Sequence, residues 1–288
     1  MSLSVASLYG VRFCTKLPLP RLVQDNIAKL RITAAAYKPV RHAKPRKPDD
    51  NWRTKTIAAY VSQLKNKDDP EYGEMFAIFN KLNTSNLDRL TEDALKLLAK
   101  RDHEFRLRVS TLLFNKAITE HMYSEIMANC AKKIIETYPD FQEDLVLHAT
   151  MFPTLYDSAT TLVYPSTDDP DFENKVVDWT KQKEKRRGYA KFLTQLFMRS
   201  LVSEDLLQTS ITQACTELST IAQQAKSDRT EENVNRYVDF LFESAKILPP
   251  STALQQLLKE LLARPRTELP SLGMRSRFRL EDALKNLK

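Results

Sequence analysis

The sequence predicts an all-α protein, a right-handed α-solenoid of about five antiparallel helical hairpins, and three observations support this. Glycine is scarce, with four in 288 residues, against roughly 7% in ordinary proteins, and glycine weakens helix interiors. Apolar residues recur at helical spacing between Glu71 and Ile134. Short polar turns separate these apolar stripes, so the helices can bury them only by stacking as hairpins.

Charge divides the chain into two parts. Residues 1–50 contain ten lysines and arginines against three aspartates, which accounts for the whole formal net charge of +7 and leaves residues 51–288 neutral. We therefore expect a basic, proline-punctuated arm over 1–50 and one helical domain over 51–288. Such an arm attracts phosphates or acidic surfaces. The alternative is a linker that its charge keeps solvated.

The sequence contains no pattern typical of a catalytic or metal site. Its four histidines show neither an HExxH motif nor zinc spacing with cysteines, and no phosphate-binding glycine loop occurs. We expect no enzyme activity, cofactor or metal. Cys14, Cys130 and Cys215 are far apart, which is typical of reduced thiols inside the cell. Without an evident secretory signal or membrane-spanning run, the expected location is the cytoplasm, with no membrane partner.

Two helices are expected before the first full hairpin. Helical spacing favours Arg21–Ala36 and Trp52–Lys67. Between them, three prolines exclude a helix and favour an extended path over Tyr37–Asp50.

The first two hairpins centre on the segments Ile78–Leu87 and Leu112–Cys130. Each predicts a helix, a polar turn and a second helix. Their turns contain Thr84, Asn86 and Thr119, helix-start residues that can accept hydrogen bonds from free backbone amides. The apolar stripes of this region are Leu87, Leu90, Ala94, Leu97 and Leu98; Phe105, Val109, Leu112 and Leu113; and Tyr123, Ile126, Met127, Cys130 and Ile134.

A third hairpin is expected to begin at Asp140 and to break near Pro153, before an exposed loop over Thr161–Asn174. A helix with a basic start follows within Lys185–Leu207, and Ser203 caps the next helix. The apolar positions of the third hairpin are Phe141, Leu145, Leu147, Met151 and Phe152. The last hairpins cover Thr230–Leu248, Ser251–Ala263 and Leu269–Leu287.

Four segments resemble the middle domain of eukaryotic translation initiation factor 4 gamma, a HEAT-like helicase-binding domain. The Asn-Lys-Leu turn with its following Thr, at residues 80–84, is similar to the opening repeat of that domain, and Leu112–Cys130 to its second repeat. The basic start at Lys185 and the Arg-rich Met274–Leu287 are similar to later repeats. The resemblance covers residues 35–288 and implies a HEAT-like solenoid.

The resemblance also implies contacts with a DEAD-box RNA helicase of the initiation factor 4A type. The implied contact residues are Tyr37, Lys38, Pro39, Asn80, Lys81, Asn83 and Thr84. Because Phe79 and Leu82 already fill the core, Asn80 and Lys81 are expected to project from the solenoid edge. The alternatives are that Asn80 caps its own turn, that Lys81 is solvated, and that Tyr37 packs on its own first helix.

The sequence departs from the family pattern in its N-terminal part. The family usually has Trp where Tyr37 lies, and Trp52 is nearby, so the alignment can be shifted. A cap-binding protein would need Tyr, four residues, Leu and an apolar residue, but Tyr9 is followed there by Cys14 and Thr15. Such a protein would therefore bind through a divergent segment or not at all. The chain is also shorter than most members, as a compact or divergent homologue, a viral homologue or a fragment would be.

Basic residues outside the helicase turn are candidates for non-specific RNA contacts. These candidates are Arg41, Lys44, Arg46, Lys47, Lys185, Arg186 and Arg187. Arg275, Arg277 and Arg279 alternate along a helix, so they spread around it and form no single stripe. A solvated helix face is the alternative to phosphate binding for both groups.

Three functions fit the sequence. The first is a translation initiation scaffold that binds and activates a DEAD-box helicase and helps recruit it to mRNA. The second is a splicing- or decay-linked adaptor for another DEAD-box protein, and the third is a passive α-solenoid scaffold. Charge reversal at Asn80 and Lys81 separates the third from the first two, because a passive solenoid has no helicase binding to lose.

Overall fold

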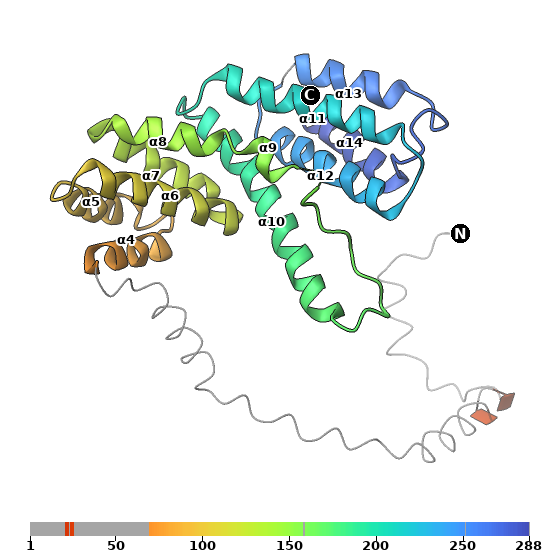
Figure 1. Cartoon of the computed structure of the whole chain (residues 1–288), viewed down its shortest axis with the longest axis horizontal. Helices are drawn as coiled ribbons and strands as arrows, with labels where there is room; N and C mark the ends of the chain where they lie inside the picture. The colour runs from red at the N-terminus through yellow and green to blue at the C-terminus, as the bar shows by residue number, and fades with distance from the viewer. Residues whose placement is uncertain (1–20, 23, 26–68, 158, 251, 288) are drawn as a thin grey trace. The chain divides into compact units, whose positions relative to one another are not determined.

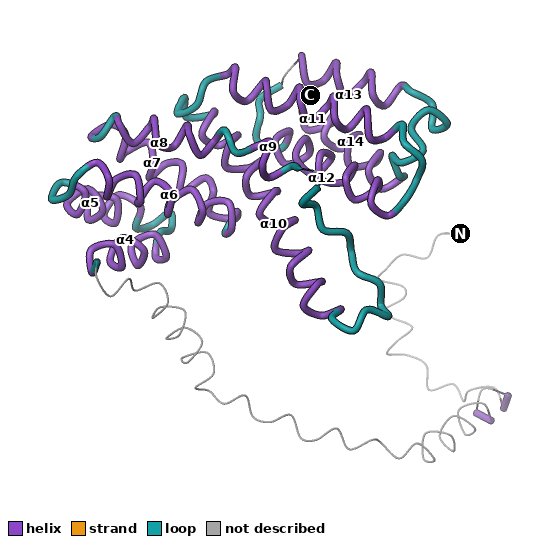
Figure 2. Tube along the Cα trace, viewed as in Figure 1, coloured by secondary structure: helices purple, strands orange, loops and turns teal. Residues whose placement is uncertain are grey.

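A computed structural model describes residues 21–22, 24–25, 69–157, 159–250 and 252–287 (Figure 1). The chain divides into two units, residues 1–63 and 64–288. In the described part of the second unit the regular structure is helical and contains no strand (Figure 2), which confirms the all-α prediction. None of these helices is long and apolar enough to cross a membrane. The extended path over Tyr37–Asp50 and the helix over Trp52–Lys67 lie outside the described residues, as does most of Arg21–Ala36.

The helices follow one another with short connections, apart from one longer connection before α10. They are α4 (Pro70–Lys81), α5 (Leu87–Leu98), α6 (His103–Thr119), the short 3-10 helix η1 (His121–Tyr123), α7 (Ser124–Thr137), α8 (Asp140–Ala149), α9 (Phe152–Leu155), α10 (Phe172–Phe197), α11 (Glu204–Ala222), α12 (Asp228–Ala245), α13 (Thr252–Ala263) and α14 (Met274–Asn286).

The helices pack in two rows. In one row α5, α7, α10, α12 and α14 each pack against the next; in the other, α4 packs on α6 and α6 on α8, while α11 packs on α13. Neighbours in sequence also pair across the rows, as α4 does with α5, α6 with α7, α11 with α12 and α13 with α14. The longest helix, α10, contacts α6, α7, α11 and α12, so it joins the N-terminal helices to the C-terminal ones.

The predicted apolar stripes form most of the core. Leu90, Ala94, Leu97 and Leu98 of α5 are buried, as are the four stripe residues of α6. Two predicted core positions are wrong. Tyr123 is 44% exposed because it lies in η1, before α7 begins, and Leu147 is 64% exposed. On α8 the buried face runs through Phe141, Leu145 and Ala149, and Leu147 points away from it.

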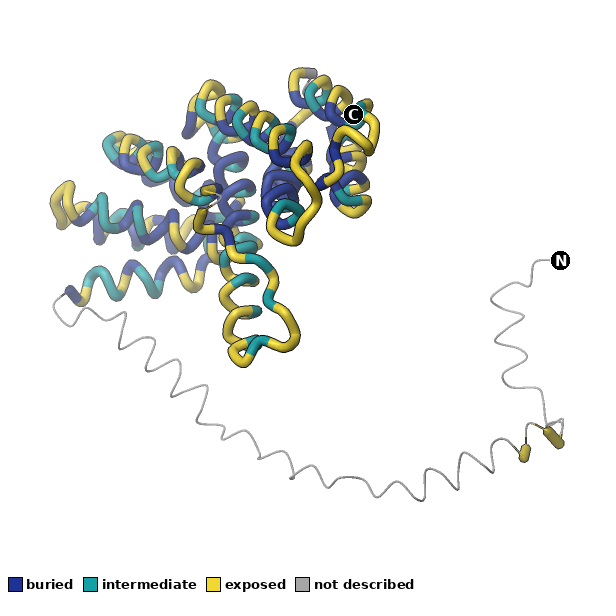
Figure 3. The backbone as a smooth tube through the Cα atoms, turned by 45° about the vertical axis from the view of Figure 1, so that its right-hand side comes forward, coloured by how far each residue is buried: buried dark blue, intermediate teal, exposed yellow. Residues whose placement is uncertain are grey.

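Three boundaries differ from the prediction. Thr119 ends α6 instead of starting a helix, and its hydroxyl donates to the carbonyl of Asn115 at 2.7 Å. The break expected near Pro153 lies at Thr150 and Met151, between α8 and α9, and Pro153 itself lies in the first turn of α9, where proline fits. The helix expected from Lys185 begins at Phe172. Its first turns are mostly exposed (Figure 3); Phe172, Val176 and Trp179 share one helical face there, but they are only half-buried.

A glycine sets the crossing of α6 and α10. A Cβ added at Gly188 would lie 1.8 Å from the carbonyl oxygen of Ile118, so the two backbones touch directly. Only glycine allows this approach. Around it, aromatic rings fill the junction: Phe114 lies edge-on to Phe192, with ring centroids 5.5 Å apart. Helix α10 is thus fixed against α6 by a backbone contact and by a ring cluster.

Candidate functional site

The end of α4 places two polar residues on the surface beside two core residues. Phe79 and Leu82 are buried, at 1% and 4% exposure. Asn80 and Lys81 between them are exposed, and neither side chain has a polar partner among the described residues. The exposure predicted for this pair is therefore found, and the alternative in which Asn80 caps its own turn is not.

The turn after α4 is ordered by two asparagines. The amide N–H of Asn83 donates to Oδ1 of Asn86 at 2.8 Å, and Oδ1 of Asn83 accepts from the N–H groups of Ser85 and Asn86 at 2.9 and 3.1 Å. Asn86 also donates from Nδ2 to the carbonyl of Lys81 at 2.8 Å. Asn83 thus holds the turn with the side chain that was expected to contact a partner. Thr84 is exposed.

A groove of about 520 Å³ lies between α4 and α5, next to this turn. Four basic side chains line it, Lys81, Arg89, Lys96 and Lys100, together with Glu74, Ala77, Ile78, Leu90, Asp93 and Leu97. Lys81, which lines this groove, is one of the residues predicted to contact a helicase. The remaining predicted sites of the arm, Tyr37, Lys38, Pro39, Arg41, Lys44, Arg46 and Lys47, lie outside the described residues.

The basic segment of α10 divides into exposed and buried members. Lys185 is exposed, as a ligand contact requires. The prediction for Arg186 is wrong, because this side chain is buried at 2% exposure. Its guanidinium donates to Oε1 of Gln182 at 2.8 Å and lies 3.7 Å from Glu232. Desolvation by burial lowers the Arg186 pKa. Arg186 therefore stabilises the packing of α10 on α12.

Arg187 lies in an ion-pair cluster that joins α10, α12 and α14. Its Nε donates to Asp239 at 2.9 Å, and Arg279 of α14 donates to the other oxygen of the same carboxylate. Asp239 is buried at 3% exposure. Arg187 belongs to the basic segment of α10 and Arg279 to that of α14. The sequence analysis did not predict that these two segments meet at one carboxylate. The acidic partner on α12 was missed, although Asp239 and Glu243 stand four residues apart within an otherwise apolar stretch.

The same surface continues toward α6. Lys191 lies 3.7 Å from Glu243 and 3.0 Å from Nδ1 of His121, whose Nε2 lies 2.6 Å from Glu184. Arg279 also stacks over the ring of Phe242 at 4.5 Å. We call this set of charged residues on α10, α12 and α14, with His121, the paired basic surface. Most of its charges are matched within the protein.

The other two arginines of α14 behave differently from Arg279. Arg277 is buried and donates to the carbonyls of Leu262 and Arg264, so it holds the end of α13. Arg275 is exposed. The predicted spreading of these residues around the helix is confirmed.

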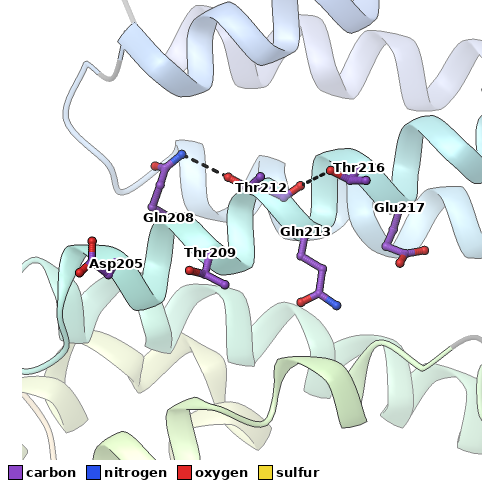
Figure 4. Close-up of a pocket in the computed structure, with 7 residues that line it drawn as sticks. All are labelled: Asp205, Gln208, Thr209, Thr212, Gln213, Thr216 and Glu217. Carbon is purple, nitrogen blue, oxygen red and sulfur yellow. Dashed lines mark hydrogen bonds between the residues drawn. The ribbon is translucent and has the colours of Figure 1, made fainter.

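A second groove, of about 530 Å³, runs along α11 (Figure 4). Its lining is polar and comes from Asp205, Gln208, Thr209, Thr212, Gln213, Thr216 and Glu217. The hydroxyl of Thr216 donates to the carbonyl of Thr212 at 2.9 Å, and Thr212 accepts from Gln208 at 3.5 Å. Gln208, Thr212 and Thr216 are thus hydrogen-bonded along the helix, whereas no side-chain hydrogen bond joins the other four lining residues in the described structure.

Reactive and metal-binding groups are not found where the structure is described. No group of three or more histidine, cysteine or acidic side chains there could hold a metal ion. Burial raises the pKa of the Cys130 thiol to about 11 and that of Cys215 to about 12. Neither cysteine is a thiolate at neutral pH, so neither is activated as a nucleophile.

Comparison of the chain with protein families and with curated proteins finds no match.

Proposed function

We propose that this protein is a translation initiation scaffold that binds and activates a DEAD-box RNA helicase of the initiation factor 4A type. Its helices would form a right-handed HEAT-like solenoid of about five hairpins, four of which correspond to the contacting pairs α4 with α5, α6 with α7, α11 with α12, and α13 with α14. The continuous row of α5, α7, α10, α12 and α14, each packed on the next, supports this arrangement. The protein would act in the cytoplasm and help to recruit the helicase to mRNA.

The observation that carries the proposal is the Asn80–Lys81 pair. Both side chains are exposed and unpartnered at the end of a helix, in the described part of the chain, while the asparagines after them order the turn. A partner that binds there does not have to order the loop, which lowers the entropic cost of association. Buried neighbours on both sides fix the direction in which the pair projects.

Activation would work by population shift. A helicase of this class has two lobes, and a scaffold that prefers one arrangement of them raises the fraction of helicase in that arrangement. This requires two contacts on one rigid body. The Asn80–Lys81 edge would supply the first contact, and the exposed cations Lys185 of α10 and Arg275 of α14 are candidates for the second and, with the arm, for RNA phosphates.

The test is the RNA-stimulated ATPase activity of the initiation helicase with and without this protein. We expect stimulation by the unmodified protein and its loss in the double variant Asn80→Asp plus Lys81→Glu. The matched control is Lys285→Glu plus Asn286→Asp, which changes the same residue types by the same charge at the end of α14. The control should still stimulate, and all three proteins should unfold at the same temperature.

Either of two results would overturn the proposal. One is a double variant that stimulates as well as the unmodified protein. The other is the lack of both stimulation and a complex on a sizing column. Binding to a different DEAD-box protein in the same assay would support the splicing or decay adaptor instead, and binding to none would support the passive scaffold.

A further inference from the structure

The groove between α4 and α5 has an apolar floor. Ile78 of α4 and Leu90 and Leu97 of α5 line it and remain 7%, 5% and 6% exposed. These side chains belong to the core of the hairpin, so they are held in place from behind. A ligand that covered them would remove the last of their surface from water.

The rim of the groove is basic. Lys81, Arg89, Lys96 and Lys100 stand on it with two acids, Glu74 and Asp93. Asp93 is already matched, since it lies 3.1 Å from Lys96 and 3.8 Å from Arg89. Lys81 and Lys100, at opposite ends, have no ion-pair partner among the described residues. Positive charge is therefore free at both ends of the groove.

The length of the groove suits a short helix. From Arg89 to Lys100 the wall is α5 and its last turn, about 16 Å at about 1.5 Å per residue. This corresponds to about three turns of a second helix laid alongside. A helix in a groove places apolar residues at positions i, i+3, i+4 and i+7 on the floor and its polar residues at the rim.

We propose that this groove binds an acidic amphipathic helix of a protein partner. Its leucine-like side chains would lie over Ile78, Leu90 and Leu97, and its carboxylates would meet Lys81 and Lys100. The inference rests on the proposed function for the identity of the partner, the helicase that contacts Asn80 and Lys81.

The lining favours a protein over RNA. Single-stranded RNA is bound by aromatic rings that stack on bases along a continuous basic path. None of the ten lining residues is aromatic, and Glu74 and Asp93 interrupt the positive rim. An acidic helix tolerates this pattern because it needs cations only where its own carboxylates fall.

The experiment measures fluorescence anisotropy of a labelled peptide of about three helical turns, with leucines on one face and glutamates on the other. The full chain is titrated as the unmodified protein, as Lys96→Glu plus Lys100→Glu, and as the charge-matched control Lys259→Glu plus Arg266→Glu, whose two sites are exposed on α13 and just after it. A second peptide replaces the glutamates with lysines. Oligouridine serves as the competitor.

We expect the acidic peptide to bind the unmodified protein and the control equally. Lys96→Glu plus Lys100→Glu should weaken it roughly tenfold, because the free cation at Lys100 becomes repulsive and Asp93 loses the lysine that neutralises it at the rim. The lysine peptide should bind the unmodified protein worse than the glutamate peptide. No binding of the acidic peptide, equal binding by the groove variant, or equal binding of the lysine peptide would overturn the inference. Displacement of the peptide by oligouridine would assign the groove to RNA instead.

The helicase complex then separates this inference from the proposed function. If the helicase loses binding to Asn80→Asp plus Lys81→Glu but tolerates Lys96→Glu plus Lys100→Glu, the inference is wrong and the proposed function stands. If the helicase binds none of the proteins, the proposed function fails and the peptide titration alone decides about the groove.

Discussion

The α4–α5 groove and the paired basic surface contain similar numbers of cations but hold them differently. In the groove, Lys81 and Lys100 have no acidic partner in the described structure. On the paired basic surface, Arg187 and Arg279 share one buried carboxylate, that of Asp239. The first region offers charge to a ligand, whereas the second uses charge to join its helices. A count of basic residues in a sequence does not reveal the charge that is available for binding.

The largest expected effect concerns the helix that carries the paired basic surface. Gly188→Ala would place a methyl group 1.8 Å from the carbonyl oxygen of Ile118. Because neither backbone can yield without moving a whole helix, we expect a loss of at least about 3 kcal/mol in the free energy of unfolding. Urea denaturation followed by circular dichroism measures it.

The matched control lies in the first region. Gly73 of α4 has open space where a Cβ would stand. Gly73→Ala should raise stability by about 0.5–1 kcal/mol, because alanine is the better helix former. Equal effects of the two substitutions would show that the contact between α6 and α10 is not as close as described.

A smaller loss of stability is expected when the ion pairs of Asp239 are broken. Asp239→Asn removes the charge that Arg187 and Arg279 share, and it leaves two mostly buried guanidiniums facing each other. We expect a loss of about 2–3 kcal/mol. In the other region, Lys100→Ala should change stability by less than about 0.5 kcal/mol. Thermal unfolding measures the stability of both variants. Similar losses of stability would show that the charge at Lys100 is not free or that the charge at Asp239 is not needed to join the helices.

The smallest effect concerns Asp144 of α8, whose carboxylate is neither free nor well paired. It is buried, its Oδ2 makes no hydrogen bond within the described structure, and it lies 3.8 Å from Nε2 of His103. Burial raises the Asp144 pKa. A folded pKa above the unfolded value means that stability falls as pH rises through that interval. Asp144→Asn removes this loss and should raise the free energy of unfolding at pH 7, by less than Asp239→Asn lowers it.

The gain should disappear near pH 3, because both the folded and the unfolded carboxyl are then protonated. Thermal unfolding at the two pH values gives the difference. Asp140→Asn is the control, since Asp140 accepts from Arg106 at 2.9 Å and its replacement should destabilise. A gain from Asp144→Asn that does not change with pH would exclude charge as its cause.

Apolar periodicity predicted the helices that bury an apolar face in the core. It did not predict the helical turns that lie outside the core. The stripes of α5 and α6 and the Ser203 cap, whose side chain accepts from the N–H of Leu206, follow the prediction. The first turns of α10 do not, because their aromatic residues pack on the connection just before the helix and not on the core: Tyr164 lies edge-on to Phe172 and to Trp179.

The candidate sites were predictable only in part. That Asn80 and Lys81 are exposed follows from the core residues on either side of them. The difference between Arg186 and Arg187 does not, because adjacent positions on a helix differ by about 100° and only the packing of α12 decides which one is buried. The partner of Arg187 lies 52 positions away on α12, where one sequence shows no sign of the contact.

Gly188 also determines how motion passes between the two regions. Side chains that separate helices can change rotamer and absorb a shift, but two backbones in contact cannot. A displacement of α6, on which α4 packs, is therefore transmitted to α10 without slack, and from there to α12. The distance between the α4–α5 groove and the paired basic surface is therefore held by a contact between backbones, which no change of side-chain rotamer can alter.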